Sequence, residues 1–397
     1  MKTSLDRILT THVGSLPRPP DLLEMLQASE SGAECDAPAI AARIRQAIVD
    51  IVARQRDLGI DIVNDGENSK TSYTLYVQDR LDGIGPKPPE EDRPQASRHR
   101  DLEEHPELVE RGRRLMLGTN WSNLVRPIAA LGPVRYGNPA ALQRDLGNLR
   151  SACDAVGIDE AFMSAASPGV LTKFVPDRYY GDEDRYIADL ADAMSVEYEA
   201  IAEAGFVLQI DAPDLGSARH NQYQHLSEPE FLKIAHRNVE ALNHATRNIA
   251  PEGMRMHICW GNYEGPHVHD IPLASLAPVI AKARPAGLSF EAANPAHGHE
   301  WADIREMDLP DDKILIPGVI DTTTNFVEHP RLVAQRIRRY ADAVGRERVI
   351  AATDCGFATF AGAHNPVVDS VVWEKLKALS EGAALASDVL WRQARAS

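Results

Sequence analysis

Short apolar segments alternate with longer amphipathic segments along most of this chain, and this alternation limits the folds open to it. Parallel strands that are buried on both faces are nearly continuous apolar runs, and a helix joins each strand to the next. Helical periodicity is clear in segments 188–204, 230–248 and 330–345, and Gly205 supplies a stop after the first of them. The sequence therefore predicts an α/β fold with a parallel sheet covered by helices.

Nine segments have the composition of strands, which is one more than a (β/α)8 barrel uses. We expect the weakest of them, 132–137, to lie outside the barrel. A doubly wound open sheet is the alternative, but no glycine-rich nucleotide-binding loop follows any of the nine segments. The predicted strands are 8–15, 60–67, 132–137, 158–167, 206–214, 255–260, 287–294, 314–321 and 348–355.

The segment 85–118 interrupts the alternation because it is rich in proline and charged residues. We interpret it as an insertion in a (β/α)8 TIM barrel, either a lid or oligomer contact over the barrel mouth or a plain surface excursion. Residues 1–397 are expected to form a single domain, because α/β barrels reach this length as one unit. The sequence leaves open whether the barrel forms a homo-oligomer.

Composition excludes several classes of partner. The chain has 58 acidic and 42 basic residues, a net charge of −16, which argues against a nucleic-acid or anionic-membrane partner because both need a basic face. No secretory signal is visible at the start, and no run approaches the ~18 apolar residues of a membrane span. Four cysteines in so long a chain are not a disulfide framework. We therefore expect a cytoplasmic protein.

Titratable residues end six of the predicted strands, and the carboxyl ends of strands are where α/β barrels build their active sites. Packing alone does not explain so regular an arrangement. The residues concerned are Asp65, Glu67, Asp211, His257, Cys259, Glu291, Asp321, Asp354 and Cys355.

Four of these residues have the chemistry of a metal site. Residues i and i+2 of a strand point to the same face, so His257 and Cys259 project together into the barrel mouth. With Glu291 and Cys355 from later strand ends they offer one nitrogen, one oxygen and two sulfur donors. Each cysteine alone is more often a small buried apolar residue. Together the four donors predict a tetrahedral Zn2+ site.

From THVGSLPR near its start to ATDCGF near its end, the chain resembles the catalytic half of the cobalamin-independent methionine synthase superfamily. The metal motif of that family is His-x-Cys, then Glu, then Cys in an Asp-Cys-Gly context. It matches His257, Cys259, Glu291 and Cys355. The resemblance implies a TIM barrel with a zinc ion that activates a thiol substrate as a thiolate.

The same resemblance implies the position of an amino-thiol substrate. VGSLP resembles the family's substrate loop and places Ser15 in the pocket, and NDGE resembles a motif that ends in a substrate-binding Glu, here Glu67. LQIDAPD resembles a motif whose Asp, here Asp211, contacts the substrate amine. The alternative is that Ser15 belongs to a simple turn and that the two carboxylates are structural ion-pair partners.

Two departures bear on the reaction. Thr323 stands where the family has a His assigned to proton delivery to folate, and Ala212 stands where methionine synthase has a Glu. The segments HICWGNYEGPH and GVIDTTTNFVEHP are similar to the single-barrel branch that includes the epoxyalkane:coenzyme M transferase. We therefore expect a zinc-dependent thiol alkyltransferase or carbon–sulfur lyase. Its substrates would be a thiol of the coenzyme M or homocysteine type and an alkyl electrophile.

The main alternative is a methionine-synthase-like methyltransferase that methylates homocysteine with a methyl donor other than polyglutamyl folate. A structural zinc site is a further alternative, but its ligands are usually close together in short loops. A decarboxylase of the uroporphyrinogen type shares the barrel and needs no zinc, so metal content separates that class.

Further residues near the predicted metal site are candidates for supporting roles. His267 and His269 are our first candidates for a general acid, with surface loop histidines as the alternative, and Asp321 is a further catalytic candidate at its strand end. We expect His12, Trp260 and Asn262 to line the substrate pocket. The loop pair His297 and His299 is expected to orient the ligands rather than to bind zinc.

Overall fold

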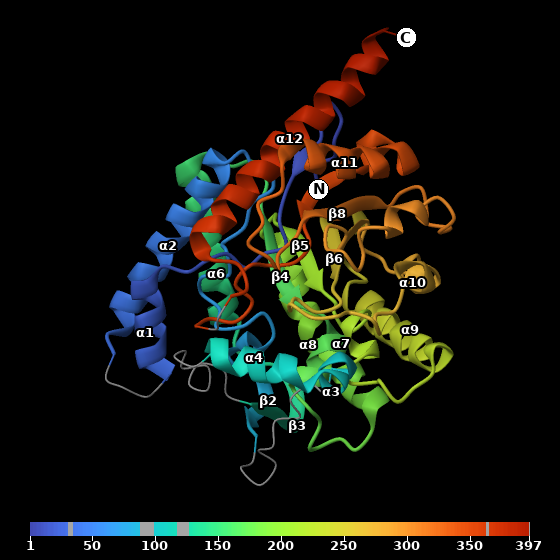
Figure 1. Ribbon diagram of the computed structural model, residues 1–397. Helices are drawn as coiled ribbons and strands as arrows, with labels where there is room; N and C mark the ends of the chain where they lie inside the picture. The colour runs from blue at the N-terminus through green and yellow to red at the C-terminus, as the bar shows by residue number, and fades with distance from the viewer. Residues whose placement is uncertain (31–34, 88–98, 117–126, 363–364, 397) are drawn as a thin grey trace.

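The computed structural model describes residues 1–30, 35–87, 99–116, 127–362 and 365–396, and a barrel of parallel strands wrapped by helices lies at its centre (Figure 1). Seven strands form one parallel sheet in the order β1-β9-β8-β7-β6-β5-β4. Residues 62–63 join its two edges, because Ile62 bridges Thr11 of the β1 segment and Val63 bridges Ala161 beside β4. They occupy the eighth strand position, and the predicted (β/α)8 barrel is confirmed.

The barrel strands agree with the predicted segments but are shorter. The second predicted strand is reduced to the bridges at residues 62–63, and the segment 64–67 that follows them carries site residues. The strands of the sheet are β1 (Leu9–Thr10), β4 (Phe162–Ala166), β5 (Val207–Asp211), β6 (Met254–Ile258), β7 (Gly287–Phe290), β8 (Ile314–Ile320) and β9 (Ile350–Thr353).

Helices cover the outer face of the barrel (Figure 1). The main ones are α1 (Pro20–Glu30), α2 (Ala37–Asp57), α6 (Pro139–Val156), α7 (Pro168–Phe174), α8 (Glu183–Glu203), α9 (Glu228–Ala245), α10 (Leu273–Ile280), α11 (Pro330–Val344) and α12 (Asp369–Ala396). Short 3-10 turns are η1 (Leu75–Asp79), η3 (Ser217–Arg219), η4 (Pro251–Gly253), η5 (Glu300–Ala302) and η6 (Arg346–Arg348). Among the described residues, none of the helices is both long enough and apolar enough to cross a membrane.

Local sequence signals explain where several helices begin and end. Asp182 precedes α8, and its carboxylate accepts hydrogen bonds from the first backbone N–H groups of that helix. Ser227 and Glu230 form a capping box at the start of α9. Gly157 ends α6 in the left-handed conformation, with φ +78°, which glycine adopts at little cost. The three helices predicted from periodicity correspond to α8, α9 and α11.

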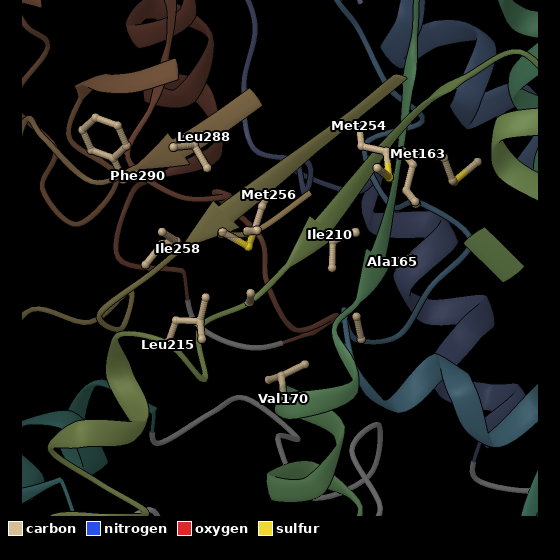
Figure 2. Packing of buried hydrophobic residues seen from close by; sticks show 14 of the residues in the cluster. Met163, Ala165, Val170, Ile210, Leu215, Met254, Met256, Ile258, Leu288 and Phe290 are labelled. Atoms are coloured by element: carbon tan, nitrogen blue, oxygen red, sulfur yellow. The ribbon is translucent and has the colours of Figure 1, made fainter. Parts of the chain in front are cut away.

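Side chains of the barrel strands alternate between the helix layer and the barrel interior. In β6, Met254, Met256 and Ile258 belong to the apolar layer beneath the helices (Figure 2). Arg255 and His257, between them in sequence, point into the barrel, as the i, i+2 rule predicts. The apolar part of the interior is a separate cluster of Leu9, Ile62, Phe162, Val207, Ile316, Ile350 and Ala352.

A hairpin and two helices form an insertion that stands apart from the barrel sheet (Figure 1). Strands β2 (Leu81–Pro86) and β3 (Ile128–Tyr136) pair antiparallel, so the expectation that segment 132–137 lies outside the barrel is confirmed. Between them lie α3 (Arg100–Glu104) and α4 (Pro106–Met116). Much of the predicted insertion, 88–98 and 117–118, falls outside the described residues. Its hairpin partner β2 was not predicted.

Candidate metal centre and substrate pocket

Strand β6 places the two residues of the His-x-Cys motif at the mouth of the barrel. Arg255, one layer below, is fixed inside the barrel: its Nε donates to Gln209 Oε1 at 2.8 Å and one terminal nitrogen donates to Thr11 Oγ1 at 2.9 Å. Burial lowers the pKa of Arg255 to about 9. These hydrogen bonds fix the side chain two residues before His257 on the same face of the strand.

Three donor atoms converge at this mouth. The ligand atoms of His257, Cys259 and Cys355 all lie within 4.8 Å of one another. The two Sγ atoms are 3.2 Å apart, and Cys355 Sγ lies 3.7 Å from His257 Nε2. Ser289 Oγ lies 3.3 Å from His257 Nδ1, which leaves Nε2 directed at the sulfur atoms. The three residues form a group that could hold a metal ion.

The electrostatics of the group suit a cation. Burial lowers the pKa of His257 to about 3, so the imidazole is neutral near pH 7, the form that binds metals. Burial raises the pKa of Cys355 well above its ordinary range. The hydrogen bond between the two thiols lowers the pKa of Cys259. Burial and the nearby Glu291 carboxylate outweigh this effect, so the pKa of Cys259 is also raised. A positive charge at the group would favour the thiolates, and two sulfurs with one imidazole are a donor set typical of zinc.

Glu291 lies beside these three donors rather than among them. Its Oε1 is 3.6 Å from Cys355 Sγ and accepts a 2.7 Å hydrogen bond from the backbone N–H of Trp260. Its Oε2 accepts from Asn294 Nδ2 at 2.8 Å. The carboxylate is therefore within reach of the group but is held by neighbours, and its role as fourth ligand remains a prediction.

Asp354 couples two of the predicted ligands, and sequence analysis assigned it no role. It precedes Cys355, and its buried carboxylate accepts hydrogen bonds from the backbone N–H groups of Ala292, Ala293 and Asn294, at 2.8 to 2.9 Å. These residues directly follow Glu291. Its position at a strand end and before Cys355 was all that the sequence showed, because the partners of the carboxylate are about 60 residues away.

Two buried carboxylates lie close to each other, one of them on the strand next to His257. Asp211 ends β5, opposite His257 of β6 in the strand register, and Gln209 Nε2 donates to its Oδ1 at 2.8 Å. Burial, together with the charge of Glu67, raises the pKa of Asp211 to about 8. Glu67 accepts from Ser164 Oγ at 2.9 Å through Oε1, and its buried Oε2 has no hydrogen-bond partner among the described residues. Burial also raises the pKa of Glu67. A cationic group placed here would relieve the repulsion between the two carboxylates.

The cations near Glu67 are already engaged. Arg18 is buried, and its guanidinium donates to the backbone carbonyls of Glu67, Lys70 and Ala358. Lys70 Nζ donates to the carbonyl of Ser164 at 2.6 Å. These side chains fix the loops around the pocket and leave the carboxylate atoms of Glu67 to other partners.

Ser15 of the VGSLP loop lies against the chain that follows Cys355. Its Oγ accepts from the backbone N–H of Ala358 at 3.2 Å, and its carbonyl accepts from the N–H of Phe357 at 2.9 Å. A Cβ on Gly356 would stand 2.2 Å from Ser15 Oγ, so this close approach requires glycine. The predicted substrate loop and the Asp-Cys-Gly motif are therefore brought together.

The other predicted pocket residues have partners within the protein. His12 is buried, its Nε2 lies 2.7 Å from Gln55 Oε1, and burial lowers its pKa to about 3. Trp260 is fully buried and donates from Nε1 to the carbonyl of Ile271 at 2.7 Å. Asn262 donates to the carbonyl of Gly356 at 2.7 Å. All three lie in segments that border the site, and their contact with substrate remains a prediction.

The predicted proton donors lie farther along the same loops. His267 Nδ1 is 2.7 Å from Asp270 Oδ2, and His269 Nε2 is 2.7 Å from Glu104 Oε2 of α3. The latter contact places α3 of the insertion on the loop that follows β6. Asp321 accepts hydrogen bonds from the backbone and hydroxyl groups of the next threonines, including Thr323. Their catalytic roles remain predictions.

Comparisons with known proteins show the family of this chain. A sequence profile of the family described as cobalamin-independent synthase, catalytic domain, matches residues 8–90 and 174–366. A methionine synthase of Saccharolobus islandicus (strain L.S.2.15 / Lassen #1) is 21% identical over 399 residues, covering 98% of each chain. A methionine synthase of Thermococcus kodakarensis is 23% identical over 352 residues, covering 87% of this chain and 86% of its own.

A solved structure shares the fold. The B12-independent methionine synthase from Shewanella sp. W3-18-1, in complex with selenomethionine, superposes with a TM-score of 0.71. It is 18% identical in sequence, and the match covers 97% of this chain and 99% of that one.

Proposed function

Because this chain belongs to the family of cobalamin-independent synthase catalytic domains, we propose that it is a zinc-dependent methyltransferase acting on the sulfur of homocysteine or a closely related amino-thiol. The observation that carries the proposal is the position of Asp211, which lies opposite His257 in the strand register and close enough to Glu67 for the two carboxylates to interact. One end of the site suits a sulfur atom and the other suits an ammonium group. An amino-thiol has both.

The same geometry makes the coenzyme M reaction, expected first from the sequence, the weaker proposal. A sulfonate would add negative charge beside Glu67 and Asp211, whose pKa values burial already raises, whereas an ammonium group would favour their ionised forms. The nearby cations Arg18 and Lys70 donate to backbone carbonyls and are not directed at a second anion. The matched relatives named above are methionine synthases, which also favours the methyltransferase alternative.

The residues that would hold zinc are His257, Cys259 and Cys355, with Glu291 as the fourth, exchangeable ligand. Bound there, zinc would supply Lewis-acid chemistry that keeps a substrate sulfur deprotonated near neutral pH. The chain itself orients the His257 ring through Ser289. Asp211 and Glu67 would hold the substrate amine and so aim its sulfur at the donors. In the reaction, the sulfur forms a bond to the methyl carbon as the bond from that carbon to the donor breaks.

Several finer assignments belong to the same proposal. The methyl donor is one other than polyglutamyl folate, because Thr323 cannot relay a proton as an imidazole does. His267, His269 and Asp321 are the proposed sources of any proton that the departing donor needs. We also propose that residues 1–397 act as one catalytic domain in the cytoplasm, with a homo-oligomer left open.

A product assay tests the proposal. Zinc-loaded enzyme is incubated with homocysteine and either 5-methyltetrahydrofolate or methylcobalamin, and methionine is measured by mass spectrometry. We expect methionine from wild type with at least one donor and none from Cys259→Ala. The proposal fails if neither donor yields methionine while an epoxide alkylates 2-mercaptoethanesulfonate on the same enzyme.

A further inference from the structure

A second group of side chains that could hold a metal ion lies in the loops after β6 and β7. The ligand atoms of His267, Asp270 and His297 lie within 4.8 Å of one another. His267 Nδ1 is 2.7 Å and His297 Nε2 is 3.0 Å from the same carboxylate oxygen, Asp270 Oδ2. The first two residues belong to the loop after β6, and His297 belongs to the loop after β7. Two imidazoles and one carboxylate are a ligand set that divalent transition metals favour.

Both imidazoles are oriented as metal ligands usually are. His297 Nδ1 lies 3.0 Å from Glu300 Oε2, and Glu300 is itself held by the backbone N–H of Leu273. His267 Nε2 lies 3.1 Å from the carbonyl oxygen of Tyr263. Metal-binding histidines commonly donate their second ring N–H to a carboxylate or a backbone carbonyl. Here each ring has such an acceptor on the side away from Asp270.

This arrangement requires positive charge at Asp270. With one proton on the outer nitrogen of each ring, the inner nitrogens would present lone pairs to a carboxylate oxygen. Either a second proton on each ring or one metal ion removes that repulsion.

A buried histidine nearby adds an independent observation. His220 is fully buried, and its Nδ1 lies 2.7 Å from Asp270 Oδ1, but neither of its ring nitrogens has a partner with hydrogen-bond geometry among the described residues. His267 holds a left-handed backbone with φ +56°, which is uncommon for a residue with a side chain. A strained backbone and a buried imidazole without a hydrogen-bond partner both oppose folding, and they persist mainly where they serve a function.

We propose that His267 Nδ1, Asp270 Oδ2 and His297 Nε2 bind a second divalent transition-metal ion. Two donors on one tetrahedral zinc stand ~3.3 Å apart, so each imidazole nitrogen has to move only a few tenths of an ångström away from Asp270 Oδ2. The site lies beside Trp260, whose ring centroid is 4.3 Å from that of His297 and whose backbone N–H donates to Glu291. The ion would tie together the loops that carry the first site. It would also exclude His267 as the general acid.

Cobalt titration separates the two sites. Metal-stripped protein is loaded with Co2+, bound metal is counted by mass spectrometry after gel filtration, and the thiolate-to-cobalt absorption is recorded. We expect two equivalents in wild type and one in the Cys259→Ser, Cys355→Ser double variant, without the thiolate band. His297→Ala should bind one equivalent and keep the thiolate-to-cobalt band. A triple variant that combines His297→Ala with the two cysteine substitutions should bind no metal.

His299→Ala is the matched control, because His299 is exposed and lies two residues from His297 in the same loop. It should bind two equivalents. Asp270→Asn, which keeps the side-chain volume, repeats the test should His297→Ala fail to fold. The proposal is overturned if the cysteine double variant binds no metal, since protons alone would then satisfy the cluster. If instead the proposed function fails because the cysteine site binds no metal, wild type will lack the thiolate-to-cobalt absorption, and this outcome is distinct from failure of the second site.

Discussion

Replacing Asp211 by Asn tests the amine-binding end of the site. The amide keeps the shape of the side chain and retains an oxygen for the 2.8 Å bond from Gln209, but it removes the negative charge. A buried hydrogen bond to a charged group contributes about 1.5 to 3 kcal/mol, so Asp211→Asn should weaken homocysteine binding by about 10- to 150-fold. Because the metal donors are untouched, KM should rise far more than kcat falls.

The variant should not fail by unfolding. Burial and Glu67 raise the pKa of Asp211 to about 8, so above its unfolded pKa the ionised carboxylate opposes folding. Removing that charge should leave the free energy of unfolding unchanged or higher. Urea denaturation of the metal-loaded variant checks this expectation separately from binding.

Calorimetry with two ligands completes the test. Wild type should bind homocysteine more tightly than 4-mercaptobutanoate, which lacks the amine, and Asp211→Asn should lose most of that preference. The exposed Asp308→Asn serves as the matched control and should keep it. The reasoning is refuted if Asp211→Asn discriminates between the two ligands as wild type does.

Two further predictions concern stability. Arg80→Met should lower the free energy of unfolding in urea by about 3 to 5 kcal/mol, because it leaves the fully buried Glu197, which lies 2.7 Å from Arg80, without its cation. The double variant with Glu197→Gln should recover part of this loss. A double variant no more stable than Arg80→Met would contradict the prediction. His12 has a folded pKa of about 3 against 6.5 when unfolded, so stability is complete above pH 6.5 and falls below it as the unfolded chain takes up the proton. Between pH 7.5 and 5.5 wild type should lose about 1.4 kcal/mol more than His12→Asn; equal losses in denaturation curves would show that His12 is not buried in its neutral form.

The parts of the fold that follow from local pattern were predictable. The alternation in β6 put His257 and Cys259 on the interior face, and the structure places their donor atoms together. Strand β2 was missed because its sequence, LDGIGP, contains glycine and proline and is a strand only through its pairing with β3. At Gly83 a Cβ would stand 2.3 Å from the carbonyl oxygen of Pro133, so the glycine serves that pairing.

Interactions between distant segments were not predictable. The bonds from Asp354 to the residues after Glu291 join two loops, and nothing in either segment indicates the other. The three-residue spacing of His267 and Asp270 is visible in the sequence, but the approach of His297 from the next strand–helix connection depends on barrel geometry. The sequence therefore indicated which chemistry was present and not which neighbours hold it in place.

The central claim is that the His257, Cys259 and Cys355 group binds zinc and brings it to an amino-thiol. The most direct measurement is the zinc absorption edge of zinc-loaded wild type with and without thiols, with zinc stoichiometry in Cys259→Ala and Cys355→Ala alongside. We predict that homocysteine changes the edge, that 2-mercaptoethanesulfonate does so only weakly, and that each variant loses the zinc of this site. A wild-type protein that cannot be loaded with zinc, or an edge that homocysteine leaves unchanged, would contradict the account.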